Sequence, residues 1–504
     1  MYRHWYHYDT HLLMTGGTGM GKSSLNEAWR RDCLTHHEPM VSVMSGKGVY
    51  EKFIDFVNYY RPKQKVICID LSNPEHIVPC NWFSNVQGED IGAHSTRIAE
   101  AVAGAWGAKN TNDMMTYAAK MGSVVRWCAE TGLPIQRAIE WLQYKSPLQE
   151  KAYNLAKSDD VRQFIMELRG MSRNEWAGTI RSTLNRLHEF SNSTALRRFT
   201  CTKEAIDIPA EVRRGSVIAV NITPQNDLAW PVSSVFAALL VSELLRADGR
   251  CFVHLDECEH YLSFDAVKLL DTSRARGLRF SLICHSDGQF DDPRTQLSVG
   301  INCGIKVVFG GLPPELRRKI ALTMFEREIN TRKIKDEFYG SEQVREDYET
   351  RSETDSESEN DGGSSGTVFN EFTGQSDSET VTRQSGKSRS KGVQKGNRFV
   401  PGARTILTGR TEFSMEEKIS LAAEILNTPR GVYHVKTPKG TTKASVPFIH
   451  SYSHSAKNVL EFEHTIPAHL IDQQEQESHD QFTGATDARP KRTTKKELSP
   501  KNPR

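Results

Sequence analysis

Two kinds of apolar pattern follow one another along the chain. Short runs of consecutive apolar residues, the pattern of strands buried on both faces, begin near Leu12 and recur over 38–46, 65–71, 216–222, 250–257, 278–286 and 302–310. Helical patterns follow two of the early runs, over 23–31 and 49–60. Strands that alternate with helices predict a parallel sheet with helices on both faces, which is an α/β fold.

From about residue 88 to residue 200 the pattern changes. Apolar residues recur at every third or fourth position, and no run favours a strand. We therefore predict an α/β core that is interrupted by an all-α insertion domain. Residues 1–87 form the first part of the core, residues 88–200 the insertion, and residues 201–339 the second part of the core.

The remainder of the chain is more polar. Residues 340–398 have few large apolar side chains and many Ser, Glu, Gly and Lys, so we predict an acidic, Ser-rich disordered linker. Residues 399–455 are expected to complete the core with a helix, capped by Ser414 and Glu417, and a hairpin that turns at 438–440. Residues 456–504 are predicted to be a flexible tail, basic at its end.

The composition indicates the setting of the protein but not its partner. The 504 residues carry a formal net charge of +2 at pH 7, and the nine cysteines form no CxxC pair. Scattered cysteines of odd number indicate reduced thiols in a cytosolic setting. The most apolar helical stretch, 230–245, is too short and too polar to span a bilayer. We expect a cytoplasmic protein with no transmembrane segment in this chain.

The clearest chemical motif is GGTGMGKS, residues 16–23, which fits the phosphate-loop pattern G-x-x-x-x-G-K-[ST] in full. Glycines let such a loop wrap a phosphate group with backbone N–H groups pointing inward. Lys22 would reach the β- and γ-phosphates of ATP, and the Ser23 hydroxyl would bind Mg²⁺. The predicted ATP-binding residues are Gly16, Gly17, Thr18, Gly19, Met20, Gly21, Lys22, Ser23 and Ser24.

A second motif is the strand CFVHLDE, which ends in Asp256 and Glu257. Asp256 is predicted to hold the Mg²⁺ ion, and Glu257 to polarise the attacking water. An adjacent acidic pair suits ATP hydrolysis better than a switch-type GTPase, and the sequence contains no guanine-reading Asn-Lys-x-Asp.

The order of these features resembles the type IV coupling proteins, the conjugative DNA-transfer ATPases of the FtsK/HerA superfamily. MTGGTGMGKSS resembles the phosphate loop of that family, and ICIDLSNPEHIVPCNWFS resembles its following strand and Asn-Pro segment. SRARGLRFSLICHSDGQF resembles a family segment of the type Arg-Lys-x-Gly, strand, Gln-Ser-x-x-Gln. The resemblance covers roughly residues 10–330 and, more weakly, 400–450, and it implies a RecA-like P-loop ATPase core.

The same resemblance implies three further catalytic residues. Arg274 would be an arginine finger that reaches the γ-phosphate in the neighbouring subunit, with Arg276 and Arg279 as rivals for that role. His285 occupies the place of the family's sensor glutamine, and Gln289 matches the second family glutamine.

The function implied by the resemblance is that of a ring motor, hexameric in form, which uses ATP hydrolysis to drive conjugative DNA transfer through a secretion channel. Its partners would be DNA, single-stranded or in a relaxase–DNA complex, and channel proteins at the inner membrane. Coupling proteins generally carry an N-terminal membrane anchor, whereas eleven residues precede LLMTGGTG here. We therefore expect either an unanchored branch that docks peripherally at the membrane or a start inside a longer reading frame.

Two alternatives share the same residues. The first is another FtsK/HerA-type DNA translocase, which packages or segregates DNA. The second is a non-catalytic, ATP-gated adaptor of a secretion complex, in which His285 leaves nucleotide binding without productive turnover.

Overall fold

The structure, a computed structural model, describes residues 9–484 except 47, 74, 107–110, 224–229, 263–269, 287–289, 291–292, 332–333, 356–367, 371–373, 377, 380–388 and 451–464. The chain divides into two compact units. The first comprises Met1–Ile320 together with Ala423–Arg504, and the second comprises Ala321–Ala422.

The first unit is organised around a sheet with nine described strands, in the order β15-β14-β8-β1-β7-β6-β2-β5-β3. Neighbours from β8 to β3 pair in parallel, whereas β14 pairs antiparallel with β8 and with β15. The strands are Leu12–Thr15 (β1), Met40–Met44 (β2), Val66–Asp70 (β3), Val217–Asn221 (β5), Cys251–Leu255 (β6), Leu278–Ile283 (β7), Ile305–Phe309 (β8), Val432–Thr437 (β14) and Gly440–Ser445 (β15).

Helices cover both faces of this sheet, because successive residues of a strand point to opposite sides. Leu12 of β1 belongs to an apolar cluster with Leu25 of α1 (Lys22–Thr35) and Phe53 of α2 (Val49–Tyr60). Leu13, the next residue, belongs to a larger cluster on the other face, together with Phe236 of α13 (Trp230–Leu244). The shorter helical elements η2 (Cys258–His260), α15 (Leu270–Ala275), α16 (Pro293–Asn302) and α17 (Pro314–Met324) follow the later strands.

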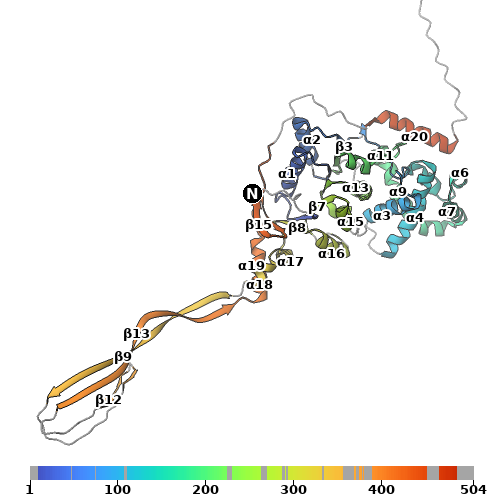
Figure 1. The fold of residues 1–504 in the computed structure, drawn as a ribbon. Coiled ribbons are helices and arrows are strands. Elements are labelled where there is room, and N and C mark those ends of the chain that lie inside the picture. Colours follow the sequence, from blue (N-terminus) through green and yellow to red (C-terminus); the bar gives the residue numbers. More distant parts are fainter. Residues whose placement is uncertain are drawn as a thin grey trace, which may run out of the picture. The chain divides into compact units, whose positions relative to one another are not determined.

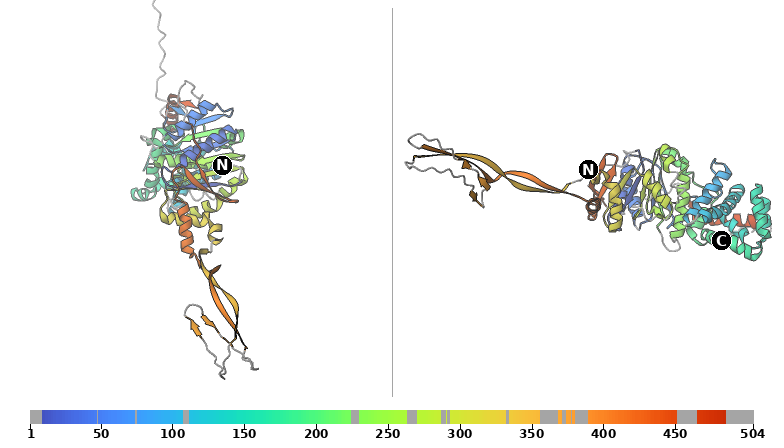
Figure 2. Two further views of the ribbon diagram at one scale, coloured as in Figure 1. Left: turned by 90° about the vertical axis from the view of Figure 1, so that its left-hand side faces the viewer. Right: turned by 90° about the horizontal axis from the view of Figure 1, so that it is seen from below.

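Between β3 and β5 the chain forms an all-α block, coloured from light blue to green in Figures 1 and 2. Its helices are Ile91–Ala105 (α3), Thr111–Thr131 (α4), Ile135–Leu142 (α5), Leu148–Leu155 (α6), Asp159–Gly170 (α7), Arg173–Thr179 (α8), Arg181–Leu187 (α9), Glu189–Asn192 (α10), Thr194–Thr200 (α11) and Ile208–Arg214 (α12). Trp127 and Trp141 of this block belong to the same apolar cluster as α13, so the block and the sheet share one hydrophobic core. Among the described residues, no helix combines the length and the apolar character needed to cross a bilayer.

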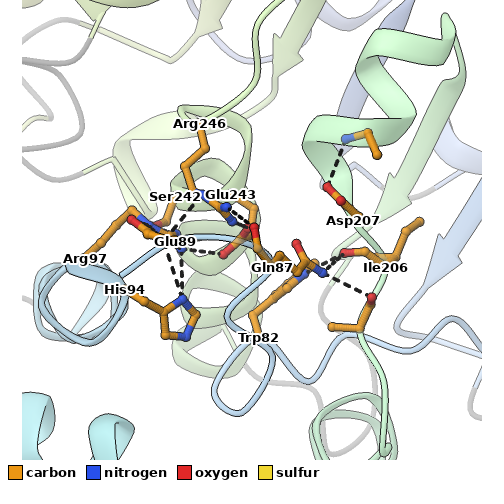
Figure 3. A network of polar contacts seen from close by, with 12 residues as sticks. Trp82, Gln87, Glu89, His94, Arg97, Ile206, Asp207, Ser242, Glu243 and Arg246 are labelled. Carbon is orange, nitrogen blue, oxygen red and sulfur yellow. Dashed lines mark hydrogen bonds and ion pairs between the residues drawn. The ribbon is translucent and has the colours of Figure 1, made fainter. Parts of the chain in front are cut away.

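A partly buried ionic network joins the all-α block to α13 (Figure 3). Arg97 of α3 pairs with Glu89 at 2.8 Å and with Glu243 of α13 at 2.9 Å. Arg246 pairs with the same two carboxylates, at 3.4 and 2.7 Å. The His94 ring, which is fully buried, lies 3.3 Å from the Arg97 guanidinium through its Nδ1 atom. Glu243 is the buried member of the network, so removing its arginine partners would leave a buried charge unpaired, and the ion pairs favour this contact between α3 and α13.

The segment that was predicted to be a flexible tail contains ordered structure. Ile466–Pro467 (β16) pairs with His76–Ile77 (β4), and Ala468–Thr483 (α20) packs on the all-α block. Phe482 is fully buried, and its ring lies 5.6 Å from that of Trp127. Arg198 of α11 and Asp472 of α20 form an ion pair at 3.0 Å. The sequence did not indicate this helix, because the apolar positions of α20 are sparse and their partners lie far away along the chain.

The second unit contains a long two-stranded ribbon where the sequence predicts disorder. Ile334–Asp355 (β9) and Arg389–Glu412 (β13) pair antiparallel along almost their whole length, as the yellow and orange strands of Figures 1 and 2 show. The unit also contains Glu326–Thr331 (α18), Val368–Asn370 (β10), Gly374–Ser376 (β11) and Ser378–Glu379 (β12), and it ends within Met415–Ile425 (α19). Over the residues of β9 and β13 the structure has paired strands where the sequence predicts disorder. That prediction relied on local composition, whereas the ribbon pairs residues that are distant in sequence.

The capping residues predicted for α19 take up that role. The backbone N–H of Glu417 donates to Ser414 Oγ at 3.2 Å, and the N–H of Ser414 donates to Glu417 Oε2 at 2.9 Å. This reciprocal capping box satisfies two N–H groups at the start of the helix.

Candidate functional site

The phosphate-loop motif lies at the edge of the sheet where the parallel strands end. β1 ends at Thr15, the loop follows, and α1 begins at Lys22. β7 pairs in parallel with β1, and β6 pairs in parallel with β7, so the carboxyl ends of these three strands lie at the same edge of the sheet. Together they enclose a cavity of about 220 Å³, lined by Thr18, Gly19, Gly21, Lys22, Ser23, Ser24, Asp256, Glu257, Ile283, Cys284, His285 and Arg430.

The glycines of the loop are required by close packing. Gly16 has φ of 153°, and a Cβ atom at this position would lie 2.5 Å from the Cβ of Phe309. A Cβ atom on Gly17 would lie 2.6 Å from the carbonyl oxygen of Gly311. Both contacts are shorter than carbon side chains tolerate, so the loop can lie against β8 only without side chains at these positions. The backbone N–H of Gly17 donates to Gly310 O at 2.9 Å and holds the loop there.

The Lys22 ammonium is buried and directed into the loop. It donates to the carbonyl oxygens of Gly16 at 2.6 Å and Gly17 at 3.1 Å. Its Nζ atom also lies 3.2 Å from His285 Nδ1. Burial lowers the pKa of Lys22, because the charged ammonium loses contact with water. An anion in the cavity would favour the charged form of Lys22, and the charged ammonium would in turn attract the anion.

Two acidic residues face this lysine from the end of β6. Burial raises the pKa of Asp256 to about 6, and the carbonyl oxygen of the same residue accepts a bond from the Tyr261 hydroxyl at 2.8 Å. Glu257 has a left-handed backbone, with φ of 49° and ψ of 44°. A left-handed non-glycine residue costs about 1–3 kcal/mol and is typical of functional sites. Its Oε1 atom lies 4.0 Å from His285 Nε2.

His285 therefore connects Lys22 with Glu257 across the cavity. Its carbonyl oxygen also accepts a hydrogen bond from the N–H of Gly16 at 3.1 Å, which ties β7 to the loop. The backbone N–H of His285 donates to Glu259 at 3.4 Å, and burial raises the pKa of that carboxyl group. Glu259 was missed in the sequence because it lies beyond the acidic pair, in the turn that follows β6.

The structure does not bring Arg274 to the cavity of its own subunit. Arg274, Arg276 and Arg279 lie around the start of β7, whereas His285 follows its end. Because a strand rises about 3.3 Å per residue, the six residues of β7 separate the two ends by about 20 Å. Arg276 donates to Leu245 O at 2.8 Å, and Arg279 pairs with Asp9. An arginine finger at Arg274 therefore requires a neighbouring subunit. Gln289 lies outside the described residues.

A second residue that no sequence motif indicated is Arg430. It lies in the segment that joins α19 to β14, and it lines the cavity. In the sheet, β14 and β7 lie on opposite sides of β1. The N–H of Gly431 donates to Met20 O at 2.8 Å, so the segment is bonded to the phosphate loop itself. The sequence NTPRG contains no known nucleotide-binding pattern, and only the path of the chain brings it to the loop.

The cavity offers oxygen donors that fit a magnesium ion. The Ser23 hydroxyl and the Asp256 carboxylate both line it. Mg²⁺ prefers oxygen ligands and is usually held by one or two protein groups, with water and substrate phosphates completing the shell. Among the described residues, no group of three or more His, Cys, Asp or Glu is arranged to hold a metal ion. The residues present thus fit a magnesium ion that arrives together with phosphates.

A phosphate loop at the carboxyl edge of a parallel sheet, faced by an acidic strand end, is the arrangement of the P-loop ATPase fold. No protein-family model matches the chain, and neither does any curated protein. Among solved structures, the chain is similar to the bacterial conjugative coupling protein TrwBΔN70 in its unbound monoclinic form, with a TM-score of 0.51 and 16% identity over 89% of this chain and 87% of that one.

Two further structures of the plasmid coupling protein TrwB are also similar. The complex with ADP and Mg²⁺ has a TM-score of 0.52 and 16% identity, over 90% of this chain and 88% of that one. The complex with the non-hydrolysable ATP analogue ADPNP has a TM-score of 0.51 and 15% identity, with the same coverage. Likenesses at this identity establish the fold. The predicted α/β P-loop fold, with its mostly parallel sheet and helical insertion, is confirmed.

Proposed function

We propose that this protein is an ATP-hydrolysing motor of the coupling-protein type, which works as a ring, hexameric in form, and drives DNA or a protein–DNA complex through a secretion channel. The observation that carries the proposal is the convergence of Lys22, Ser23, Asp256 and Glu257 on one cavity at the edge of the sheet. The solved structures of TrwB with ADP and Mg²⁺, and with ADPNP, support nucleotide binding in this fold.

Each residue has a distinct part in the proposed reaction. The backbone of 16–21 and the Lys22 ammonium bind the phosphates of ATP, aided by the positive end of α1. Ser23 and Asp256 would hold Mg²⁺, which would supply positive charge beside the transferring phosphate. Glu257 orients the attacking water. His285 lies between Lys22 and Glu257 and positions both, while Arg274 reaches the site from the next subunit.

The proposed partners follow from the likeness to coupling proteins. They are DNA, single-stranded or bound to a relaxase, and channel proteins at the inner membrane, where this chain would act from the cytoplasmic side. The all-α block, which shares a core with the sheet, is proposed to recognise the transferred complex.

Steady-state ATP hydrolysis, measured with and without single- and double-stranded DNA, tests the proposal. We expect turnover that DNA stimulates and that Lys22→Ala abolishes. Lys63→Ala is a matched control, because Lys63 is an exposed lysine of the same unit and lies outside the cavity. Turnover that DNA leaves unchanged would contradict the DNA motor. A complete absence of turnover, with ATP still bound, would favour the non-catalytic adaptor.

A further inference from the structure

The segment Thr428–Gly431 closes over the phosphate loop within the first unit. A Cβ atom on Gly310, beside the loop, would lie 2.1 Å from the carbonyl oxygen of Thr428, so the two backbones touch. The N–H of Gly431 donates to Met20 O at 2.8 Å, and the carbonyl oxygen of Gly431 accepts from the N–H of Val446 at 2.7 Å. These contacts hold the segment between the loop and the β14–β15 hairpin.

Arg430 lies in this segment with its backbone held on both sides. Thr428 Oγ1 donates to Val432 O at 2.8 Å, which closes a turn around Pro429 and Arg430. Because the next residue, Gly431, is bonded to Met20, the Cα atom of Arg430 cannot move away from the loop without breaking that bond. The position of this arginine relative to the phosphate loop is therefore set by backbone contacts.

The Arg430 side chain is exposed and lines the same cavity as Lys22. Among the described residues it has no hydrogen bond or ion pair, although Asp256 and Glu257 line the cavity too. Two cations on one small cavity repel each other unless an anion lies between them. A planar guanidinium is well suited to bind phosphate oxygens in pairs.

We propose that Arg430 contacts the phosphates of the nucleotide bound in its own subunit. This inference rests on the proposed function, since it assigns a further residue to the same ATP site. It also distinguishes two arginines by the subunit from which each would reach the phosphates. Arg430 reaches the phosphates from within the subunit, whereas Arg274 lies at the far end of β7 and can act only from a neighbour.

The contact would connect the nucleotide with the edge of the sheet. Gly431 directly precedes β14, which pairs with β8 next to the phosphate-loop strand β1. A phosphate group that contacts both Arg430 and the phosphate loop would thus link the loop with the β14–β15 hairpin. Loss of the phosphate would release one of these links.

Binding of tripolyphosphate and of a fluorescent ATP analogue to the full chain tests this assignment. Tripolyphosphate is the informative probe, because it contains the phosphate chain without the nucleoside. For Arg430→Ala we expect the dissociation constants of both ligands to rise by about 10-fold or more, the range for one charged hydrogen-bonding contact. Arg430→Lys should recover part of the loss, since it keeps the positive charge.

The control is Arg318→Ala, which removes an exposed arginine of the same unit outside the cavity. It should leave both affinities unchanged. Wild-type affinity in a folded Arg430→Ala variant would overturn the assignment. If the wild-type chain itself bound neither ligand, the proposed function would fail with it, and that result is distinct from a failure confined to Arg430.

Discussion

The two β regions of this protein are held together by different physics. In the sheet of the first unit, strands of four to six residues run mostly parallel, and residues such as Leu12, Val41 and Val253 are fully buried between helices. In the second unit, β9 and β13 are 22 and 24 residues long and pair antiparallel. β9 contains eight acidic and three basic residues, whereas β13 contains six basic residues and one acidic residue.

The register of the ribbon shows how such polar strands select each other. Every basic position of β13 lies opposite an acidic position of β9, in the pairs Arg389–Asp355, Lys391–Glu353, Lys395–Glu349, Arg398–Glu346, Arg404–Glu342 and Arg410–Glu337. Opposite charges directly across a strand pair stabilise it by about 0.2–1 kcal/mol each, and like charges destabilise it. Burial of apolar side chains accounts for the sheet, whereas the order of charges along β9 and β13 favours this register of the ribbon.

The largest effect is expected from a cavity in the core of the first unit. Phe236 of α13 is fully buried, and its ring lies 5.5 Å from Trp82 and 5.8 Å from Phe199. Phe236→Ala should lower the free energy of unfolding by about 3–5 kcal/mol. Urea unfolding followed by tryptophan fluorescence measures this loss. Tyr59→Ala, on an exposed position of α2, should change it little. A comparable loss of amide protection in the ribbon would show that the two regions are not independent.

A smaller and more local effect is expected from a reversed charge in the ribbon. Arg398→Glu places a like charge opposite Glu346 and should destabilise the ribbon by about 1 kcal/mol, because an attraction becomes a repulsion. Amide hydrogen exchange over 334–412 measures this change. The double variant Glu346→Arg with Arg398→Glu restores opposite charges and should recover the protection. At about 1 M salt, charges are screened beyond roughly 3 Å, so the exchange rates of the single and double variants should become similar. Equal exchange in both variants at low salt would refute the charge register.

The smallest effect is expected from a change of pH. It should alter the stability of the first unit, through His94, and leave the ribbon unchanged. Burial lowers the pKa of His94 below its usual value of 6.5, with the Arg97 guanidinium as the second cause. As pH falls through 6.5, His94 becomes protonated in the unfolded chain but stays neutral in the folded one. The free energy of unfolding therefore falls with decreasing pH. His94→Gln should reduce the stability lost between pH 7.5 and pH 5.5, measured by urea unfolding. The carboxylates of the ribbon have ordinary pKa values near 4 in an unfolded chain, so its protection should change little over this interval. An identical pH profile for wild type and His94→Gln would refute this account.

The candidate site shows how far local sequence patterns reach. GGTGMGKS predicts its own loop, because the requirement for glycine and lysine is contained within eight residues. The strand ending in Asp256 and Glu257 is equally local, and both motifs line one cavity. His285 also lines it, although the resemblance to a known family, rather than a local pattern, indicated that residue. Their roles in catalysis remain predictions.

Arg430 and Glu259 show where that reach ends. Neither residue stands in a motif, and Arg430 comes to the cavity only because β14 returns to the sheet beside β8 after the whole second unit. The family resemblance indicated Arg274, whereas its distance from the cavity of its own subunit depends on the direction of β7.

The sequence by itself determined the elements whose signals are local: the alternating buried strands and helices of the core, the helical insertion, the phosphate loop and the capping box of α19. Only the tertiary structure decided which distant segments meet. It paired an acidic strand with a basic one in a stretch whose composition favours disorder, docked α20 on the all-α block, and brought Arg430 to the phosphate loop. The physical reason is that periodicity and turn chemistry depend on neighbours within a few residues, whereas strand register, ion pairs and cavities depend on contacts between residues that only the folded chain brings together.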